Sequence, residues 1–337
     1  MSAAPGAMAG PAALVATGIV SVQVGAGLAT RLFHELPPAA VTGLRLWSAA
    51  IVMLIIGGRG AKAAITGLVS RGAWRDAVVT AAFGVCLGAM NFVFYQAIAR
   101  VPLGVAVTIE FLGPLAVAVA GSRRPLDLLW VALAGTGVVL LTGGGAAHLS
   151  VPGVIFAGLA AAGWAAYILL SAATGRRFPG SSGLVIAMLI AAVVVTPAAL
   201  ATANASLRRP AVLATGAGVG LLSSAIPYGA DLRALRRVPT RVFGIWMSLE
   251  PAAAALIGLA LLGQHLSAGE WAAVGCVVAA CLGAARSAPP PAAPDQLSGP
   301  AAPGTPPGSQ TRHHRPRQSL PLLLTHRPQP PSPASRK

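Results

Sequence analysis

Two acidic side chains and one basic side chain stand inside long apolar stretches of the sequence, where charged residues are otherwise rare. Glu110 lies in GVAVTIEFLGPLAVAV, Glu250 lies in MSLEPAAAAL, and Arg45 lies in GLRLWSAA. A charge at the centre of a bilayer costs at least about 2.5 kcal/mol, so such a group needs a partner, a proton or a water-filled cavity. If these stretches cross a membrane, the three residues are the first candidates for binding a substrate or carrying a proton.

A proline lies close to each acid and changes what the backbone offers there. Pro114 lacks the N–H that would bond to the carbonyl group of Glu110, so that carbonyl is free. Pro251 frees the carbonyl group of Met247 in the same way. The backbone carbonyl group and the side-chain carboxyl group of Glu110 are therefore both available for binding at the same position in the span. The alternative for Glu110 is structural: a protonated carboxyl group hydrogen-bonded between helices.

Arg45 stays charged in practice, which leaves it two interpretations. It forms an internal ion pair with Glu110 or Glu250, or it holds the carboxylate of a substrate through two parallel hydrogen bonds. Polar or amphipathic side chains within the apolar stretches complete the candidate set, although each alone is more often a contact between helices than a ligand contact. These candidates are Gln23, Asn91, Tyr95, Trp164, Tyr167 and Tyr228.

The composition is that of a membrane protein rather than a soluble one. Charged residues make up 9% of the chain and hydrophobic residues 55%, whereas a soluble protein carries about 25% charged residues. Cys86, Cys276 and Cys281 lack metal-ligand spacing, and no glycine-rich phosphate loop occurs. The sequence predicts no metal, no cofactor and no catalytic site. The net charge of +16 comes without a base-reading motif, so we expect no nucleic-acid partner.

Spanning about 30 Å of hydrocarbon takes roughly 20 apolar residues, and polar breaks divide the chain into segments of this length. The breaks RLFHELP and GRGAK are clear, whereas the break at residues 100–102 is weak. The first segment lacks a basic region before it and is expected to be retained. The ten predicted spans are residues 12–32, 38–57, 77–98, 102–121, 126–143, 151–173, 182–200, 212–234, 242–263 and 267–285.

The distribution of basic residues predicts the orientation of these spans. With the N-terminus in the cytoplasm, twelve Lys and Arg residues fall in inside loops and four in outside loops, and cytoplasmic loops carry the excess of positive charge. Both termini are therefore expected inside. The inside residues are Arg59, Lys62, Arg71, Arg75, Arg123, Arg124, Arg176, Arg177, Arg233, Arg236, Arg237 and Arg241, and the outside residues are Arg31, Arg100, Arg208 and Arg209.

The two halves of the chain resemble each other. RVPLGVAVTIEFLGP begins at Arg100 and RVPTRVFGIWMSLEP at Arg237, each with a second proline twelve residues after the first. Five spans is an odd number, so the second set inserts upside down relative to the first. We expect an all-α polytopic membrane protein of ten transmembrane helices, built as two inverted five-helix repeats (residues 11–143 and 151–285) with the binding site between them.

Residues 286–337 differ from the rest of the chain. They contain half of all the prolines and cannot bury enough apolar surface to fold alone, which predicts a disordered, Pro/Arg-rich cytoplasmic tail. His313 and His314 lie in this tail and are not expected to bind a metal. A contact of the basic segment with anionic lipid headgroups is the alternative to a free tail.

Three stretches resemble the EamA-type members of the drug/metabolite transporter superfamily: MNFVFYQAIARVPLGVAVTIEFLGPLAVAV, SRRPLDLLWVALAG and SSAIPYGADLRALRRVPTRVFGIWMSLEPAAAALIGLALLG. The resemblance covers about residues 11–285. It implies an exporter of the bacterial inner membrane, driven by the proton gradient, that moves threonine, homoserine or related metabolites outwards. It also draws attention to Asp231. One departure is Gln264, where relatives commonly carry an acid; if that acid helps gate or couple transport, gating differs in this chain.

We therefore expect a secondary exporter of small amino acids in which Glu110 is the proton or amine site and Arg45 its partner or a carboxylate clamp. One alternative is an exporter of another metabolite or a drug. The other is a membrane scaffold or partner subunit that transports nothing. A scaffold does not need buried charges at mid-membrane, so charge-neutral substitutions there would leave it intact. The sequence does not name the substrate or the oligomeric state.

Overall fold

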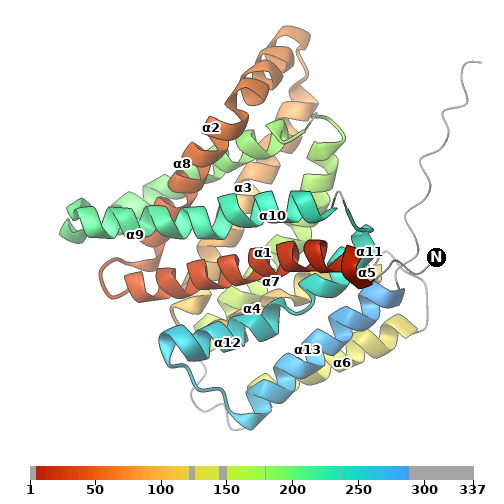
Figure 1. The fold of residues 1–337 in the computed structure, drawn as a ribbon. Helices are drawn as coiled ribbons and strands as arrows, with labels where there is room; N and C mark the ends of the chain where they lie inside the picture. Colours follow the sequence, from red (N-terminus) through yellow and green to blue (C-terminus); the bar gives the residue numbers. More distant parts are fainter. Residues whose placement is uncertain (1–4, 121–125, 144–149, 179, 236, 288–337) are drawn as a thin grey trace, which may run out of the picture. The chain divides into compact units, whose positions relative to one another are not determined.

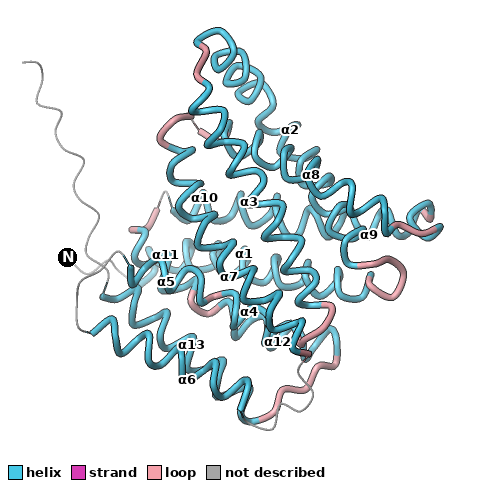
Figure 2. The backbone as a smooth tube through the Cα atoms, turned by 180° about the vertical axis from the view of Figure 1, so that it is seen from behind, coloured by secondary structure: helices cyan, strands magenta, loops and turns pink. Residues whose placement is uncertain are grey.

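The computed structural model describes residues 5–120, 126–143, 150–178, 180–235 and 237–287, and within these ranges every regular element is a helix (Figures 1 and 2). Eight helical segments are long and apolar enough to cross a membrane. Two shorter apolar segments, residues 126–141 and 210–225, fall on the predicted fifth and eighth spans. The prediction of an all-α chain is confirmed for the described residues.

The helices follow the predicted spans in order. The first half contains α1 (Pro5–Leu32), α2 (Pro38–Arg71), α3 (Trp74–Ile98), α4 (Leu103–Glu110), α5 (Leu112–Ala120) and α6 (Leu126–Gly143). The second half contains α7 (Val151–Gly175), α8 (Ser182–Thr202), the 3-10 turn η1 (Ala205–Arg208), α9 (Pro210–Gly220), the π-helical turn η2 (Leu221–Ala225), α10 (Ile226–Leu235), α11 (Thr240–Met247), α12 (Glu250–Leu262) and α13 (Ala268–Ser287).

The helix α2 runs past residue 57, where the predicted apolar span ends. It continues to Arg71, and Gly72 ends it in a left-handed conformation (φ 59°) that caps the carbonyl groups of Leu68 and Val69. A glycine inside a helix costs only about 1 kcal/mol relative to alanine, and the Ala, Arg and Lys residues beside it favour the helix. At 1.5 Å per residue the 34 residues of α2 extend about 51 Å.

Three predicted spans are interrupted at their middle, each four residues before a proline. The helix α4 ends at Glu110 and α11 ends at Met247, the residues whose carbonyl groups Pro114 and Pro251 leave free. The third interruption is η2, and Pro227 leaves the carbonyl group of Ser223 free within it. Each interruption exposes polar backbone at mid-span, so these are the places where the fold can bind a polar ligand.

The start and end of α4 and α11 have nearly the same backbone geometry. Pro102 precedes α4 with φ −54° and ψ 143°, and Pro239 precedes α11 with φ −59° and ψ 144°. The residues after the two helices, Phe111 and Ser248, have ψ −12° and −13°. The two segments that begin R-V-P, one in each half of the sequence, therefore form two short helices that start and end with the same backbone geometry.

Glycines allow two pairs of helices to approach closely. A Cβ atom on Gly84 of α3 would lie 2.8 Å from the carbonyl oxygen of Ala187 in α8. A Cβ atom on Gly220 of α9 would lie 2.8 Å from the carbonyl oxygen of Arg45 in α2. The helices α6 and α13 run side by side, and α4 packs against α12 (Figure 1).

Several predictions concern residues outside the described ranges. The predicted disordered tail falls almost entirely on residues 288–337, which the structure does not describe. The side chain of Tyr228 and the residues Arg123, Arg124 and Arg236 also lie outside the described part. What the sequence predicts for these residues stays a prediction.

Candidate functional site

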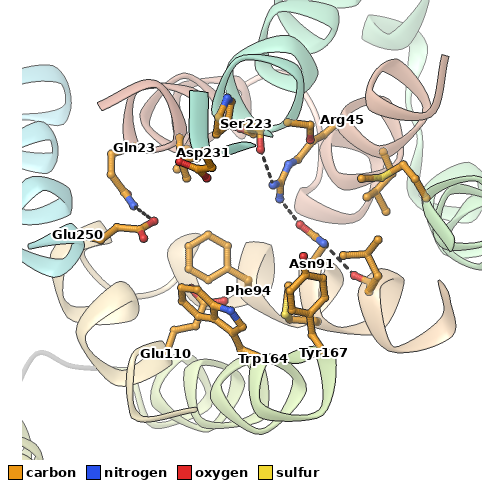
Figure 3. A pocket seen from close by; sticks show the side chains of 18 of the residues that line it. Gln23, Arg45, Asn91, Phe94, Glu110, Trp164, Tyr167, Ser223, Asp231 and Glu250 are labelled. Carbon is orange, nitrogen blue, oxygen red and sulfur yellow. Dashed lines mark hydrogen bonds between the residues drawn. The ribbon is translucent and has the colours of Figure 1, made fainter. Parts of the chain in front are cut away.

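A cavity of about 220 Å³ lies where the interrupted helices meet α1, α2, α3, α7 and α8 (Figure 3). Seven of the nine residues predicted from the sequence line it, although they come from both halves of the chain. They are Gln23, Arg45, Asn91, Glu110, Trp164, Tyr167 and Glu250. Their function stays a prediction, but the structure brings them to one place.

Arg45 projects from α2 into the cavity and is held by neutral groups. Its guanidinium donates a hydrogen bond to Oδ1 of Asn91 and a longer one, 3.5 Å, to the carbonyl oxygen of Ser223. It also lies over the ring of Tyr95, 5.3 Å from the ring centroid. Asn91 is itself fixed by a 2.8 Å bond from Nδ2 to the carbonyl oxygen of Leu87.

The first interpretation of Arg45, an ion pair with Glu110 or Glu250, is not the arrangement found. Within the described part of the chain, ion pairs join Arg177 to Asp76 and Arg209 to Glu35, and neither involves Arg45. A guanidinium held by neutral partners keeps its charge uncancelled. This arrangement favours the second interpretation of Arg45, as a group that binds the carboxylate of a ligand.

Glu250 lies across the cavity from Arg45 and accepts a hydrogen bond from Gln23 (Figure 3). The distance from Gln23 Nε2 to Glu250 Oε1 is 3.0 Å. Glu250 begins α12, is only 6% exposed, and its Oε2 has no hydrogen-bond partner among the described residues. A buried polar atom without a partner is uncommon, so Oε2 is available to a ligand donor.

Glu110 ends α4 and is 8% exposed. It shares this part of the cavity with Trp164, whose ring meets that of Phe111 edge to face at 4.9 Å. Met247 also lines the cavity, and it is the eleventh residue of the R-V-P segment that begins at Arg237, as Glu110 is of the segment that begins at Arg100. The two halves therefore contribute equivalent positions but different chemistry, one acid and one thioether.

Asp231 also lines the cavity, although only the family resemblance drew attention to it. Its Oδ1 has no hydrogen-bond partner in the described structure, and Gly18 of α1 leaves room for it, since a Cβ atom there would lie 2.9 Å from that oxygen. Sequence reasoning missed Ser223 and Ser224 as well, which η2 brings to the cavity. The available signal was Pro227, four residues after Ser223.

Tyr95 and Gln264 lie outside this cavity. Tyr95 is 1% exposed, and its ring faces the guanidinium group of Arg45. The rings of Phe33 and Phe94 pack edge to face against the Tyr95 ring. Gln264 lies between α12 and α13, and its Oε1 accepts a 2.9 Å hydrogen bond from the backbone N–H of Leu103. Gln264 therefore caps the start of α4.

The charges of the cavity are arranged in a way that matches an amino acid. Arg45 offers one positive group, and Glu110, Asp231 and Glu250 offer three carboxyl groups from other directions (Figure 3). An α-amino acid carries one carboxylate and one ammonium group about 3 Å apart. A cavity with a cationic side and an anionic side can bind both groups at once.

Apolar helices around a polar cavity, broken where the cavity lies, are typical of a secondary transporter. Residues 151–286 match the EamA-like transporter family. The chain is also 38% identical over 275 residues to the threonine/homoserine exporter RhtA of Escherichia coli (strain K12), an alignment that covers 81% of this chain and 90% of that protein. The chain therefore belongs to the EamA-like transporter family and is a multi-pass membrane protein.

Other relatives and one solved structure agree with this assignment. The threonine/homoserine exporter RhtA of Salmonella typhimurium (strain LT2) is 38% identical over 78% of this chain and 87% of its own length. The uncharacterized transporter YwfM of Bacillus subtilis (strain 168) is 27% identical over 56% of this chain and 66% of its own length. One crystal structure matches 81% of this chain and 96% of its own, with a TM-score of 0.52 and 18% identity, which supports the fold alone.

Proposed function

We propose that the protein is a proton-coupled secondary exporter of small amino acids similar to threonine and homoserine, located in a bacterial inner membrane. The proposal rests on one observation: Arg45, held by neutral groups, lines the same cavity as Glu110, Asp231 and Glu250. The names of the relatives at 38% identity support the same substrate class.

In the proposed binding mode, Arg45 holds the carboxylate of the substrate and the three acids hold its ammonium group. Asn91 keeps the guanidinium in position, which reduces the entropy lost on binding. Glu250 is itself positioned by Gln23. The 220 Å³ of the cavity is enough for a small amino acid.

Coupling to protons follows from competition at Glu110. A carboxylate buried at mid-membrane is costly unless a positive group neutralises it, and either the substrate ammonium or a proton can do so. When the two compete for one carboxylate, the carrier moves substrate in one direction and a proton in the other. This exchange is the physical basis of the proposed antiport.

We further propose that residues 11–143 and 151–285 are inverted repeats. Packing supports this, because exchanging each helix for its counterpart in the other half converts the α3–α7 pair into the α10–α1 pair and the α3–α8 pair into the α9–α2 pair. The pairs α2–α8 and α6–α13 convert into themselves. The family match to residues 151–286 coincides with the second repeat.

The test is uptake of radiolabelled amino acids into everted membrane vesicles with an imposed proton gradient. We expect uptake of threonine and homoserine by the parent protein. Arg45→Lys loses the planar guanidinium that binds a carboxylate through two hydrogen bonds, so its Michaelis constant should rise about tenfold or more. Arg45→Gln should lose uptake. Arg71→Lys, at the exposed end of α2, is the control and should transport normally. Absence of uptake for every amino acid in the panel, or normal uptake by Arg45→Gln, would refute the proposal.

A further inference from the structure

A second cavity of about 140 Å³ lies between α3, α7 and the start of α8. Its walls include Phe83, Ser171, Thr174, Gly183 and Leu184. This end of α7 and α8 is the end that the distribution of basic residues assigns to the cytoplasm. Arg177 and Asp76, 3.0 Å apart, join the end of α7 to the start of α3 there.

Tyr167 lines both the second cavity and the 220 Å³ cavity that contains Arg45, called the central cavity below. Its ring packs against Phe83 with centroids 5.4 Å apart and planes tilted by 48°. The two cavities therefore share the side chain of Tyr167 as a wall. A change in the rotamer of Tyr167 would alter the space on both sides of its ring.

Two features give the second cavity a preference for anions. Thr174 is 2% exposed, and its hydroxyl group has no hydrogen-bond partner among the described residues, although most buried hydroxyl groups have one. Gly183 and Leu184 belong to the first turn of α8, where backbone N–H groups lack partners inside the helix and Ser181 provides no side-chain cap. Free N–H groups at a helix N-terminus favour a carboxylate.

We propose that the second cavity is a carboxylate-binding subsite, which the amino acid occupies after leaving the cytoplasm and before it passes Tyr167 into the central cavity. Thr174 donates a hydrogen bond to the substrate carboxylate, and the N–H groups of Gly183 and Leu184 complete the subsite. This inference rests on the proposed function, since it concerns the same substrate and the same direction of transport.

The first experiment removes the hydroxyl group of Thr174. Thr174→Val keeps the shape of the side chain, and loss of a hydrogen bond to a charged group should raise the Michaelis constant for L-threonine at the cytoplasmic face about tenfold. The matched control is Thr136→Val on α6, an exposed position outside both cavities. With normal amounts of protein in the membrane, an unchanged constant for Thr174→Val would overturn the proposal.

The second experiment measures occupancy directly and does not depend on transport rates. Ser171→Cys is made in a variant without Cys86, Cys276 and Cys281, and everted vesicles are treated with methanethiosulfonate reagents of similar size and opposite charge. We expect the anionic reagent to react faster than the cationic one, and L-threonine to slow the reaction. Equal rates without protection by threonine would overturn the proposal.

The outcomes separate this subsite from the proposed function. If parent vesicles take up threonine but Ser171→Cys is not protected, the exporter assignment stands and the subsite is wrong. If parent vesicles take up no amino acid, the proposed function fails and the subsite fails with it. Protection together with the raised Michaelis constant of Thr174→Val supports both.

Discussion

Glu110 and Glu250 lie at opposite ends of their helices, and this gives the two acids different surroundings. Glu110 ends α4, where the carbonyl groups carry partial negative charge, whereas Glu250 begins α12, where the N–H groups carry partial positive charge. Gln23 also donates a hydrogen bond to Glu250. Within the proposed function, we therefore propose that Glu110 carries the transported proton and that Glu250 holds the ammonium group of the substrate.

Replacing Glu110 separates proton coupling from substrate binding. Glu110→Gln keeps size and hydrogen bonding but cannot titrate, so export driven by a proton gradient should fail, while exchange of labelled for unlabelled threonine at equal concentrations should survive. Glu110→Asp should keep partial activity. Both are measured in everted vesicles.

Glu270→Gln provides the control for this substitution, because Glu270 lies outside the cavity and pairs with Ser267 in a capping box that glutamine also supports. It should leave driven export unchanged. Normal driven export with normal pH dependence for Glu110→Gln would instead make Glu110 a structural residue and move the search for coupling to Glu250.

The second prediction at this scale concerns Gln264, which caps α4 through a single side-chain oxygen. Gln264→Glu keeps an acceptor at a helix N-terminus and should preserve stability and transport. Gln264→Leu leaves the N–H of Leu103 without its partner and should lower stability by about 1 kcal/mol. Thermal unfolding of the purified protein measures both, and equal melting temperatures for the two variants would contradict this role.

At the scale of helices, the three interruptions could be predicted to different extents. Pro114 and Pro251 predicted the freed carbonyl groups of Glu110 and Met247, where α4 and α11 end, because a missing N–H acts on a known neighbour four residues earlier. Pro227 carried the same signal for Ser223, but the π-helical turn that turns Ser223 and Ser224 to the cavity depends on packing against α1 and α2. Local sequence does not encode that packing.

The sequence did not predict the length of α2 or the partners of Arg45. The reasons for the two are related. Hydropathy predicts where the apolar stretch ends, whereas a helix ends where its hydrogen bonds end, here at Gly72. Arg45 was correctly expected to face the interior. Its choice of Asn91 and the Ser223 carbonyl group over a glutamate depends on the approach of α2 to α3 and η2, which is a property of the tertiary structure.

The close contact between α9 and α2 gives a prediction at this scale. Gly220→Ala would bring a methyl group within 2.5 Å of Ser48 Cβ and 2.8 Å of the Arg45 carbonyl oxygen, and such overpacking costs about 1–3 kcal/mol. Gly218→Ala, on the same helix, meets nothing within 4 Å and should be neutral or slightly stabilising. Melting temperatures in detergent compare the two, and an equal shift would contradict the packing described here.

At the scale of the molecule, the twelve-to-four bias of basic residues predicts both termini in the cytoplasm. In a variant without the three native cysteines, a thiol reagent that cannot cross the membrane should label Lys62→Cys and Arg177→Cys only from the cytoplasmic side. It should label Asn204→Cys only from the opposite side. Labelling with the reverse sidedness would overturn the proposed orientation.

The length of α2 also relates the protein to the thickness of its bilayer. About 51 Å of helix exceeds a hydrocarbon core of about 30 Å, so the last turns of α2, with Arg59 and Lys62, extend beyond it. Lipids with longer acyl chains would draw these charges toward hydrocarbon, and the bilayer would thin locally, or the two side chains would extend toward the headgroups, to relieve the mismatch. Because α2 also carries Arg45, lipid chain length becomes a physical variable that acts on the guanidinium of the central cavity.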